Sequence, residues 1–469
     1  MAKIKKKHVL RLGYPLGEAA NLAVEAMKHD KFEAKGREVK MQVLQAVLSV
    51  PEQYYKHQIL GPVAHALKPI VRPEDAPIYP ELLAEPVPMR IWGKQEIERG
   101  AIEQIEIAAS LPVARQAALM PDAHQGYGLP IGGVLATENA IIPYAVGVDI
   151  GCRMCLTVYD LPAKHLDRYS YQLKQMLVEY TVFGAGKGPE KPMDDPVLER
   201  PEFETISVVK DLKDKAWRQI GSSGGGNHFV EFGLVDLMED NNQWGLVPGT
   251  YVGILSHSGS RGLGAKIANH YTRLAMERTK LPKHARHLAW LDMNTQEGQE
   301  YWLAMNLAGD YASACHHHIH YKLSKAMGAK PILTVENHHN FAWKDQLADG
   351  TDVYVHRKGA TPAAKGVMGI IPGSMTAPGF IVRGRGEMSA LQSASHGAGR
   401  LMSRTRAKQS ITRSALNKLL REKQITLIGG GLDEAPIAYK DIHKVMANQK
   451  DLVKVVGSFQ PKIVRMAKD

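Results

Sequence analysis

The chain has 469 residues, a formal net charge of +11 and an apolar fraction of 44%, values typical of a globular protein with a sizeable core. It lacks an apolar run of about 18 residues or more, which predicts no membrane span. Its basic N-terminus has no apolar segment typical of a secretory signal, and three cysteines are too few for a disulfide framework. We therefore expect a cytoplasmic protein without a membrane partner, and the positive charge favours a polyanionic partner.

Residues 1–84 have the pattern of a separate helical unit. Apolar residues recur at helical spacing over residues 19–27 and 39–47. Prolines recur over residues 51–80, and the proline-rich stretch 69–88 is the expected linker. We expect a helical N-terminal extension with its linker over residues 1–84 and a catalytic domain over residues 85–469. The extension is interpreted as a structural appendage, although docking on the catalytic part or recruitment of a partner also fits the pattern.

The stretch that organises the chain comes after an amphipathic helix, which the apolar periodicity predicts over residues 95–110. Within residues 120–155, apolar runs of strand-like composition alternate with glycine-rich turns. The runs are residues 131–136 and 145–150, and the turns display Asp122, His124, Asp149 and Cys152. Asp149 and Cys152 flank a glycine in a D-I-G-C turn, where a carboxylate and a thiolate can bind a divalent cation.

A second cysteine and a run of histidines also suggest metal or redox chemistry, but both interpretations are weak. Cys155 completes a C-R-M-C pattern, yet the sequence has no second CxxC motif and lacks the βαβ context of a thioredoxin-like site. By strand alternation, Cys155 faces away if Cys152 faces the site. The four histidines within residues 316–320 point around the predicted helix and do not reach one ion, so we expect no metal there.

The rest of the chain mixes helices and strands. Residues 184–203 have loop composition, a polar helix extends from there to residue 220, and residues 285–330 are expected to be largely helical. Strands are predicted at residues 154–159, 332–337, 352–359, 379–384 and 425–430, and helices at residues 399–422 and 436–450. The order lacks the βαβ rhythm of a doubly wound sheet, and no Walker A motif is present. We therefore expect an α+β fold with a mixed sheet.

A series of motifs resembles those of the RtcB family of RNA ligases, in the family's order. The motifs are PDAHQGYGLPIGG, GVDIGC, GGGNHF, HSGSRGLG, HHN, HRKGAT, IPGSMTAPGFIVRG, SHGAGRLMSR and AYKDI. The resemblance covers residues 87–455. It implies an RtcB-like catalytic domain and a GTP-dependent ligase that joins a 2′,3′-cyclic phosphate or 3′-phosphate RNA end to a 5′-hydroxyl end, in RNA repair or tRNA splicing.

The resemblance gathers metal ligands from distant parts of the chain. The expected ligands are Asp149, Cys152, His228, His257 and His339. Five ligands are too many for one tetrahedral zinc ion but suit two adjacent ions, and the thiolate of Cys152 is the natural bridge. Ligand softness alone favours zinc, whereas the resemblance implies two Mn(II) ions.

His396 is the expected nucleophile. It lies in SASHGAGR among small residues, and a neutral imidazole nitrogen can attack a phosphorus atom. The motif is similar to the family's guanylylated-histidine motif, which implies that His396 takes GMP from GTP and passes it to the RNA 3′-phosphate as an RNA-ppG intermediate. The resemblance also implies guanine-nucleotide contacts by Asn227, Glu231, Ser374, Gly397, Gly399, Arg400 and Lys468, and an RNA contact by Arg261.

Two departures and two alternatives accompany this interpretation. Arg153 stands where relatives commonly have glycine, which predicts bulk and positive charge beside the metals, and the tail around Lys468 is spaced differently from the family's end. A metal-dependent phosphoesterase or nuclease fits the same metal set, as does a non-catalytic RNA-binding paralogue; covalent GMP separates the ligase from both. The implied partners are RNA, GTP and an archease-like activator.

Overall fold

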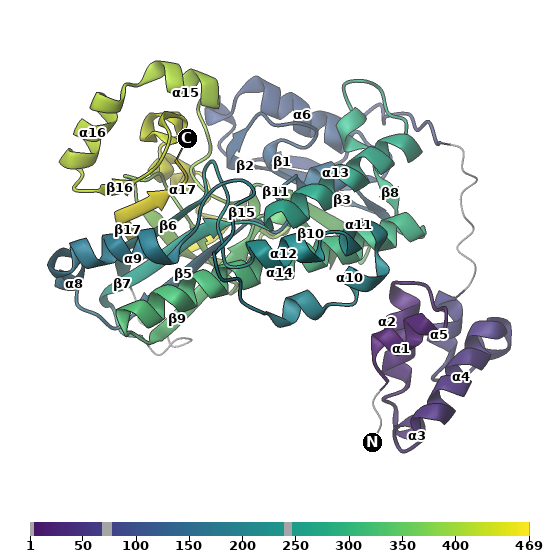
Figure 1. The fold of residues 1–469 in the computed structure, drawn as a ribbon. Helices are drawn as coiled ribbons and strands as arrows, with labels where there is room; N and C mark the ends of the chain where they lie inside the picture. Colours follow the sequence, from purple (N-terminus) through teal and green to yellow (C-terminus); the bar gives the residue numbers. More distant parts are fainter. Residues whose placement is uncertain (1–3, 68–76, 239–245, 469) are drawn as a thin grey trace.

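The N-terminal unit consists of short helices with a core of their own. In the computed structural model, which describes residues 4–67, 77–238 and 246–468, these helices are α1 (Lys6–Arg11), α2 (Glu18–Ala26), α3 (Asp30–Glu33), α4 (Arg37–Ser49) and α5 (Gly61–Ala66) (Figure 1). Val9, Ala23, Leu44 and Val63 are fully or almost fully buried among them. Leu16 packs instead against the core of the larger part. Residues 68–76, which include the first part of the expected linker, lie outside the described residues.

A five-stranded sheet carries the PDAHQG and HRKGAT motifs. Its order is β1-β2-β3-β11-β10, with β1 (Met89–Ile91), β2 (Ala114–His124), β3 (Ile131–Thr137), β11 (Asp352–Lys358) and β10 (Asn340–Gln346). β1 pairs with β2 in parallel, and the other pairs are antiparallel. Helix α6 (Arg99–Ala109) buries Ile105 against one face, and α17 (Ile442–Ala447) buries Val445 against the other.

An eight-stranded sheet forms the centre of the larger part. Its order is β13-β14-β17-β6-β7-β5-β9, with β16 beside β17. The strands are β5 (Arg153–Tyr159), β6 (Phe229–Leu237), β7 (Gly249–Ser258), β9 (Pro331–His338), β13 (Met368–Ile371), β14 (Gly379–Gly384), β16 (Thr426–Ile428) and β17 (Val453–Met466). Helices α9 (Ser170–Tyr180) and α14 (Gln296–Met327) pack on one face, where Leu177, Ile319 and Val252 share a core.

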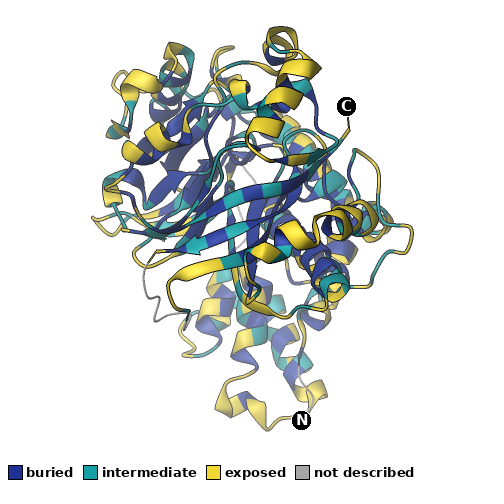
Figure 2. Cartoon of the chain, turned by 90° about the vertical axis from the view of Figure 1, so that its left-hand side faces the viewer, coloured by how far each residue is buried: buried dark blue, intermediate teal, exposed yellow. Residues whose placement is uncertain are grey.

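The remaining helices and two short strand pairs complete the fold. The helices are α7 (Pro143–Val146), α8 (Lys164–Arg168), α10 (Glu202–Thr205), α11 (Ser207–Lys210), α12 (Lys213–Gln219), α13 (Arg261–Arg278), α15 (Arg404–Ser410) and α16 (Arg413–Glu422). Two-stranded pairs join β4 (Ala140–Ile141) to β8 (Leu291–Asp292) and β12 (Ala360–Pro362) to β15 (Ser393–Ser395). In Figure 2 the central strands are largely buried and the outer helical faces are exposed. Across the described residues, no helix is both long and apolar enough to cross a membrane.

The α+β fold with mixed sheets is confirmed, and four local predictions are wrong. The polar helix expected up to residue 220 is instead three short helices, α10, α11 and α12. Residues 145–150 do not form a strand: they belong to α7 and the turn after it. Asp122 and His124 lie at the end of β2 rather than in a turn. The helices predicted over residues 399–422 and 436–450 are shorter, because α15 begins at Arg404 and α17 spans only Ile442–Ala447.

Candidate metal and nucleotide site

Four of the expected metal ligands lie where neighbouring strands of the larger sheet end. The strands β6, β7, β5 and β9 are consecutive and antiparallel. Cys152 directly precedes β5 and His228 directly precedes β6, whereas His257 lies near the end of β7 and His339 follows β9. In an antiparallel pair, the start of one strand lies beside the end of its neighbour. These four side chains therefore meet at one end of the strands, although they are far apart in sequence.

The side-chain atoms of these ligands converge on one another. The Cys152 Sγ lies 3.1 Å from His257 Nε2 and 3.5 Å from His228 Nε2. His257 Nε2 is 3.2 Å from His339 Nε2, and His228 Nε2 is 2.9 Å from Asp149 Oδ2. The structure therefore brings all five expected ligands together, with Cys152 in contact with two of the histidines.

The D-I-G-C turn is shaped by Gly151 and by Asn340, a residue to which the sequence interpretation assigned no role. Gly151 has φ +69°, and a Cβ there would lie 2.7 Å from Gly309 Cα, so a larger residue would meet both strain and a clash. Asn340 holds the turn in place, because its carbonyl accepts from the Gly151 N–H at 2.8 Å and its amide donates to the Asp149 carbonyl at 3.3 Å. The HHN motif was the available signal for Asn340.

The electrostatics of the cluster suit a cation. Burial, with the charge of His228 next, lowers the pKa of His257 to about 3. Burial, with the charge of His396 next, lowers the pKa of His339 well below its ordinary value. Burial, with the charge of Asp149 next, raises the pKa of the Cys152 thiol. Neutral imidazoles present lone pairs, and a cation replaces the thiol proton when it binds.

The chemistry of these donors fits a bound metal. Each short contact in this cluster joins two atoms that both carry a lone pair when they are deprotonated. A single proton can form a hydrogen bond in only one of these contacts at a time. Cys152, His228 and His257 each offer a ligand atom within 4.8 Å of the others, and all three side chains are buried. One carboxylate, one thiolate and three imidazoles can hold divalent transition metals, and softness alone does not select manganese over zinc.

His396 is oriented by Asp122, a carboxylate in the PDAHQG motif. Its Nδ1 lies 2.7 Å from Asp122 Oδ2, which also accepts from the backbone N–H groups of His396 and Gly397 at 3.2 and 3.3 Å. Burial acts to raise the pKa of Asp122, but the charge of His396 and its hydrogen bond hold that pKa below its ordinary value. An ionised Asp122 keeps the proton on Nδ1, which leaves Nε2 with a free lone pair.

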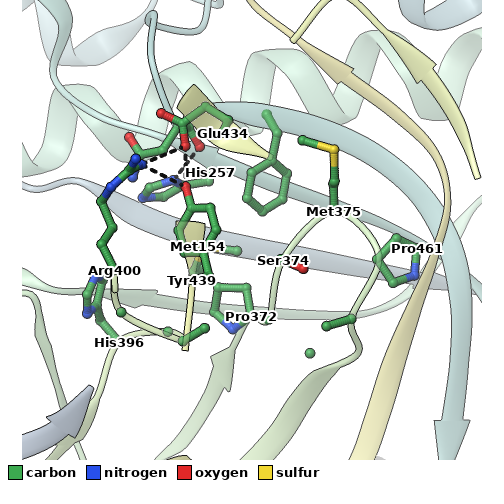
Figure 3. Close-up of a pocket in the computed structure, with 18 of the residues that line it drawn as sticks. Met154, His257, Pro372, Ser374, Met375, His396, Arg400, Glu434, Tyr439 and Pro461 are labelled. Atoms are coloured by element: carbon green, nitrogen blue, oxygen red, sulfur yellow. Dashed lines mark hydrogen bonds and ion pairs between the residues drawn. The ribbon is translucent and has the colours of Figure 1, made fainter. Parts of the chain in front are cut away.

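The expected nucleotide contacts line one pocket with metal ligands. The pocket has a volume of about 350 Å³, and Figure 3 shows Met154, Ser374, His396 and Arg400 around it. Its lining includes His257, His339, Asn227, Glu231, Ser374, His396, Gly397, Gly399 and Arg400. The ring centroids of His339 and His396 are 4.9 Å apart. A nucleotide in this pocket would therefore have its phosphates within reach of both His396 and the metal ligands.

Arg400 is held at the pocket wall by acidic and aromatic partners. Its guanidinium donates to Glu434 Oε2 at 3.3 Å, to the Tyr439 hydroxyl at 3.4 Å and to the Asp433 carbonyl at 2.7 Å (Figure 3). Arg404 pairs with the side chains of both Asp433 and Glu434. These partners fix the direction of the Arg400 side chain, so it is a preorganised contact for an anionic group.

Two expected contact residues lie apart from this pocket. Lys468 is exposed and is absent from the lining. Arg261 lies behind the GGGN segment, where it donates to Ser222 Oγ at 3.1 Å and to the Gly184 and Lys187 carbonyls at 2.7 and 3.2 Å. In this arrangement Arg261 ties together two loops beside the metal ligands.

Arg153 points away from the expected metal ligands but stays close to their turn, because its Nε donates to the Gly151 carbonyl at 3.3 Å. Its guanidinium pairs with Glu336 and donates to the Gly309 carbonyl at 2.7 Å, on the side of β5 that faces α14. Cys152 precedes the strand and Met154 faces the pocket, so Arg153 points to the opposite face. The positive charge of Arg153 is therefore paired with Glu336 on the face of the sheet that α14 covers.

Cys155 lies close to His316 and His320 on that same face, and the ligand atoms of the three are within 4.8 Å of one another. A chain of hydrogen bonds, in which each donor and acceptor can be assigned, already accounts for the ring nitrogens of His316 and His320. His316 Nε2 meets only a carbonyl, Ser258 O at 3.1 Å, so it donates, and its Nδ1 accepts from Ser256 at 2.6 Å.

The same chain continues into His320. Because the Ser256 hydroxyl proton is used, His320 Nε2 donates to Ser256 Oγ at 2.7 Å, and its Nδ1 accepts from Thr157 Oγ1 at 2.7 Å. Burial lowers the pKa of both imidazoles to about 3, which keeps them neutral. All four ring nitrogens have protein partners, so a hydrogen-bonded core network explains this cluster without an ion.

Comparison with known proteins points to one family. The model of the family described as tRNA-splicing ligase RtcB matches residues 104–206 and 198–467. The RNA-splicing ligase RtcB of Escherichia coli (strain K12) is 34% identical over 409 residues, covering 81% of this chain and 97% of that protein. The tRNA-splicing ligase RtcB of Nanoarchaeum equitans (strain Kin4-M) is 28% identical, covering 80% and 94%. The RNA-splicing ligase RtcB homolog 1 of Entamoeba dispar is 30% identical, covering 77% and 81%.

Proposed function

Because the chain belongs to the tRNA-splicing ligase RtcB family, we propose that it is an RNA ligase that uses GTP and two Mn(II) ions. It would join a 2′,3′-cyclic phosphate or 3′-phosphate end to a 5′-hydroxyl end, in RNA repair or tRNA splicing. The observation that supports this most directly is His396, which Asp122 orients at 2.7 Å in the wall of the pocket that also contains His257 and His339.

The proposed reaction begins at His396 Nε2. This atom attacks the α-phosphorus of GTP, so that a P–N bond forms and pyrophosphate leaves, while Asp122 retains the proton on Nδ1. An oxygen of the RNA 3′-phosphate then attacks the same phosphorus and frees the imidazole, which gives RNA-ppG. Finally the 5′-hydroxyl attacks the RNA phosphate and GMP leaves. A cyclic phosphate must first be opened by hydrolysis.

The metal ligands and the remaining pocket residues have distinct parts in this proposal. Asp149, Cys152, His228, His257 and His339 would hold the two ions, which polarise phosphates and offset the charge of pyrophosphate. Arg400 faces the same pocket with its guanidinium fixed, and so would hold a phosphate oxygen. Arg261 would contact RNA where the RNA approaches the two loops that Arg261 connects, at residues 184–187 and 222.

Guanine selection is proposed for Glu231, whose side chain is buried in the pocket lining. Burial raises the pKa of Glu231 well above its ordinary value. The N1–H and the amino group of guanine would donate to the two carboxylate oxygens and so compensate for the free-energy cost of burying the charged carboxylate. Adenine does not offer this pair of donors.

We expect Glu231→Gln to lower the preference for GTP over ATP in adduct formation about 10- to 100-fold, because one acceptor in a buried pair is lost. Asp236→Asn is the matched control, since it removes a carboxylate from the same strand outside the pocket. Competition between the two labelled nucleotides measures the effect. An unchanged preference in Glu231→Gln, or an equal loss in the control, would remove Glu231 from guanine recognition.

The N-terminal helices are proposed to be a separate unit, and the family match begins only at residue 104. The segment after the linker belongs with the catalytic part, because Ile78 pairs with Thr279 and the Leu83 N–H donates to the Ser110 carbonyl at 2.7 Å. The structure therefore favours a start at Pro77 over one at Glu85.

We expect a chain that starts at Pro77 to keep GMP transfer, since all proposed catalytic residues lie after that point. A chain that starts at Glu85 should transfer GMP but unfold more easily, because it loses the Ile78 and Leu83 hydrogen bonds, each worth about 1 kcal/mol. Thermal unfolding and adduct formation measure both effects. A folded Pro77 chain without GMP transfer would show that the N-terminal helices contribute to the site.

Ligation of defined RNA ends tests the proposed function. Strands with a 3′-phosphate or cyclic phosphate and a 5′-hydroxyl should be joined only when GTP and Mn(II) are present. Cleavage or phosphate release without GTP would favour the phosphoesterase or nuclease, and RNA binding without either reaction would favour the non-catalytic paralogue. Multiple turnover by the protein alone would show that an archease-like activator is dispensable.

A cytoplasmic location is part of the same proposal. All three cysteines are free and buried. A thiolate that binds metal must stay reduced, and the cytoplasm keeps thiols reduced.

A further inference from the structure

Helices α15 and α16 form a basic surface outside the catalytic pocket. Residues 404–423 contain seven basic side chains and one acidic side chain, Glu422. The basic residues, all exposed, are Arg404, Arg406, Lys408, Arg413, Lys418, Arg421 and Lys423. Figure 1 shows the two helices together at the upper left, beside the C-terminal strands. An excess of this size over twenty residues creates a strong local positive potential.

The helices are fixed by their apolar side, so the charges face outward. Leu416 and Leu420 of α16 are buried in a cluster with Val464 and Met466 of β17. Arg413 donates to the Gly430 carbonyl at 3.0 Å, which anchors the start of α16. Lys418 and Arg421 are three residues apart and therefore lie on one side of the helix. This basic surface is a rigid array rather than a mobile tail.

The basic surface borders the catalytic pocket. Arg404, in the first turn of α15, lines that pocket and pairs with Asp433 at 3.1 Å and Glu434 at 3.2 Å. A second, open pocket of about 450 Å³ is lined by Arg404, Lys408 and Gly226. Gly226 lies two residues before the metal ligand His228. A chain of phosphates that leaves the metal ligands on this side would pass directly onto α15.

We propose that α15 and α16 bind the backbone of the RNA strand whose 3′-phosphate reacts. This inference rests on the proposed ligase function, in which that phosphate must reach the GMP on His396. Evenly spread basic side chains can contact successive phosphates of a strand without reading its bases. A membrane surface fits less well, because Leu416 and Leu420 point into the protein and leave no apolar side to enter lipid.

The test removes four charges that lie outside the pocket. The variant carries Arg406→Gln, Lys418→Gln, Arg421→Gln and Lys423→Gln and leaves Arg404, Lys408 and Arg413, which contact protein groups. A matched control changes four exposed lysines elsewhere to glutamine: Lys280, Lys283, Lys325 and Lys330. Binding of a labelled single-stranded RNA with a 3′-phosphate is measured over a range of salt concentrations, and GMP adduct formation is measured without RNA.

The slope of log affinity against log salt is negative, and we expect its magnitude to be smaller by about 3 in the variant. Each of the four lost phosphate contacts to a single strand would contribute about 0.7 to that magnitude. The control should keep the wild-type slope, and both proteins should form the GMP adduct normally. A wild-type slope in the variant, or an equal loss in the control, would overturn the proposal. Preferential binding of acidic vesicles or acidic peptides over RNA would overturn it too. If the wild type forms no GMP adduct but the variant shows a salt slope of smaller magnitude, the proposed ligase function would be contradicted. The assignment of α15 and α16 as an RNA-binding surface would still hold.

Discussion

Replacing Cys152 with alanine is expected to abolish GMP transfer and to release at least one metal ion. Its Sγ lies 3.1 Å from His257 Nε2 and 3.5 Å from His228 Nε2, so its loss removes the donor that lies between these two histidines. Loss of residues that only orient metal ligands costs about 10- to 100-fold, so loss of Cys152 should cost more than about 100-fold in GMP transfer. Metal analysis and labelling with GTP measure both effects.

Cys155→Ala is the matched control, because Cys155 is equally buried but lies on the opposite face of β5, 4.0 Å from His320 Nδ1. This variant should keep its Mn(II) content and GMP transfer, with a stability loss on the order of 1 kcal/mol from the small cavity. Equal losses of metal in the two variants would contradict the assignment of Cys152 and would favour a site that uses both cysteines.

Replacing His396 with alanine is expected to eliminate the GMP adduct while the metal ligands still bind Mn(II). His396 Nδ1 lies 2.7 Å from the Asp122 carboxylate, whereas Nδ1 of His124, in the same lining, lies 3.2 Å from the Asp122 backbone carbonyl, so the carboxylate orients His396. The later displacement needs the 5′-hydroxyl and the metals rather than the imidazole. The variant should therefore still join an RNA whose 3′ end is supplied already activated with GMP.

Two measurements separate this outcome from a general loss of structure. Mn(II) content should be unchanged in His396→Ala, and the pre-activated RNA should be joined at a rate near that of the wild type. An adduct that persists in the variant would assign the nucleophile to another residue. Failure to join the pre-activated RNA, with normal metal content, would show that His396 also acts in the final step.

The fold was predictable where the sequence pattern and the local backbone agree. Residues 131–136 and 154–159 consist mostly of apolar residues, and both lie in strands. Residues 145–150 are also mainly apolar, but Pro143 suits the first turn of a helix and Gly147, with φ +97°, ends it. β17 (residues 453–466) was not predicted, because Gly457 and Pro461 interrupt its pattern and only pairing with β14 and β6 defines it.

The types of site residue were predictable, but their supports were not. Glycine-rich turns and motif order pointed to Cys152 and the histidines, whereas their meeting depends on the order β6-β7-β5-β9, which no local pattern encodes. Asp122 and Asn340 were missed as supports because each acts through a contact distant in sequence. Asp122 reaches His396 across 274 positions, and Asn340 reaches Asp149 across 191. The direction of the Arg153 side chain was not predictable, because its partner, Glu336, lies on a neighbouring strand.

The measurement that tests the central claim most directly is incubation of the intact protein with α-labelled GTP and Mn(II), followed by mapping of the label. We predict one labelled residue, His396, joined to GMP by a P–N bond that is labile in acid and comparatively stable in base. Its orientation by Asp122 at 2.7 Å, with Nε2 free, is the basis of that prediction. Label on another residue, or no adduct with GTP and Mn(II), would contradict the proposed mechanism and would favour the phosphoesterase.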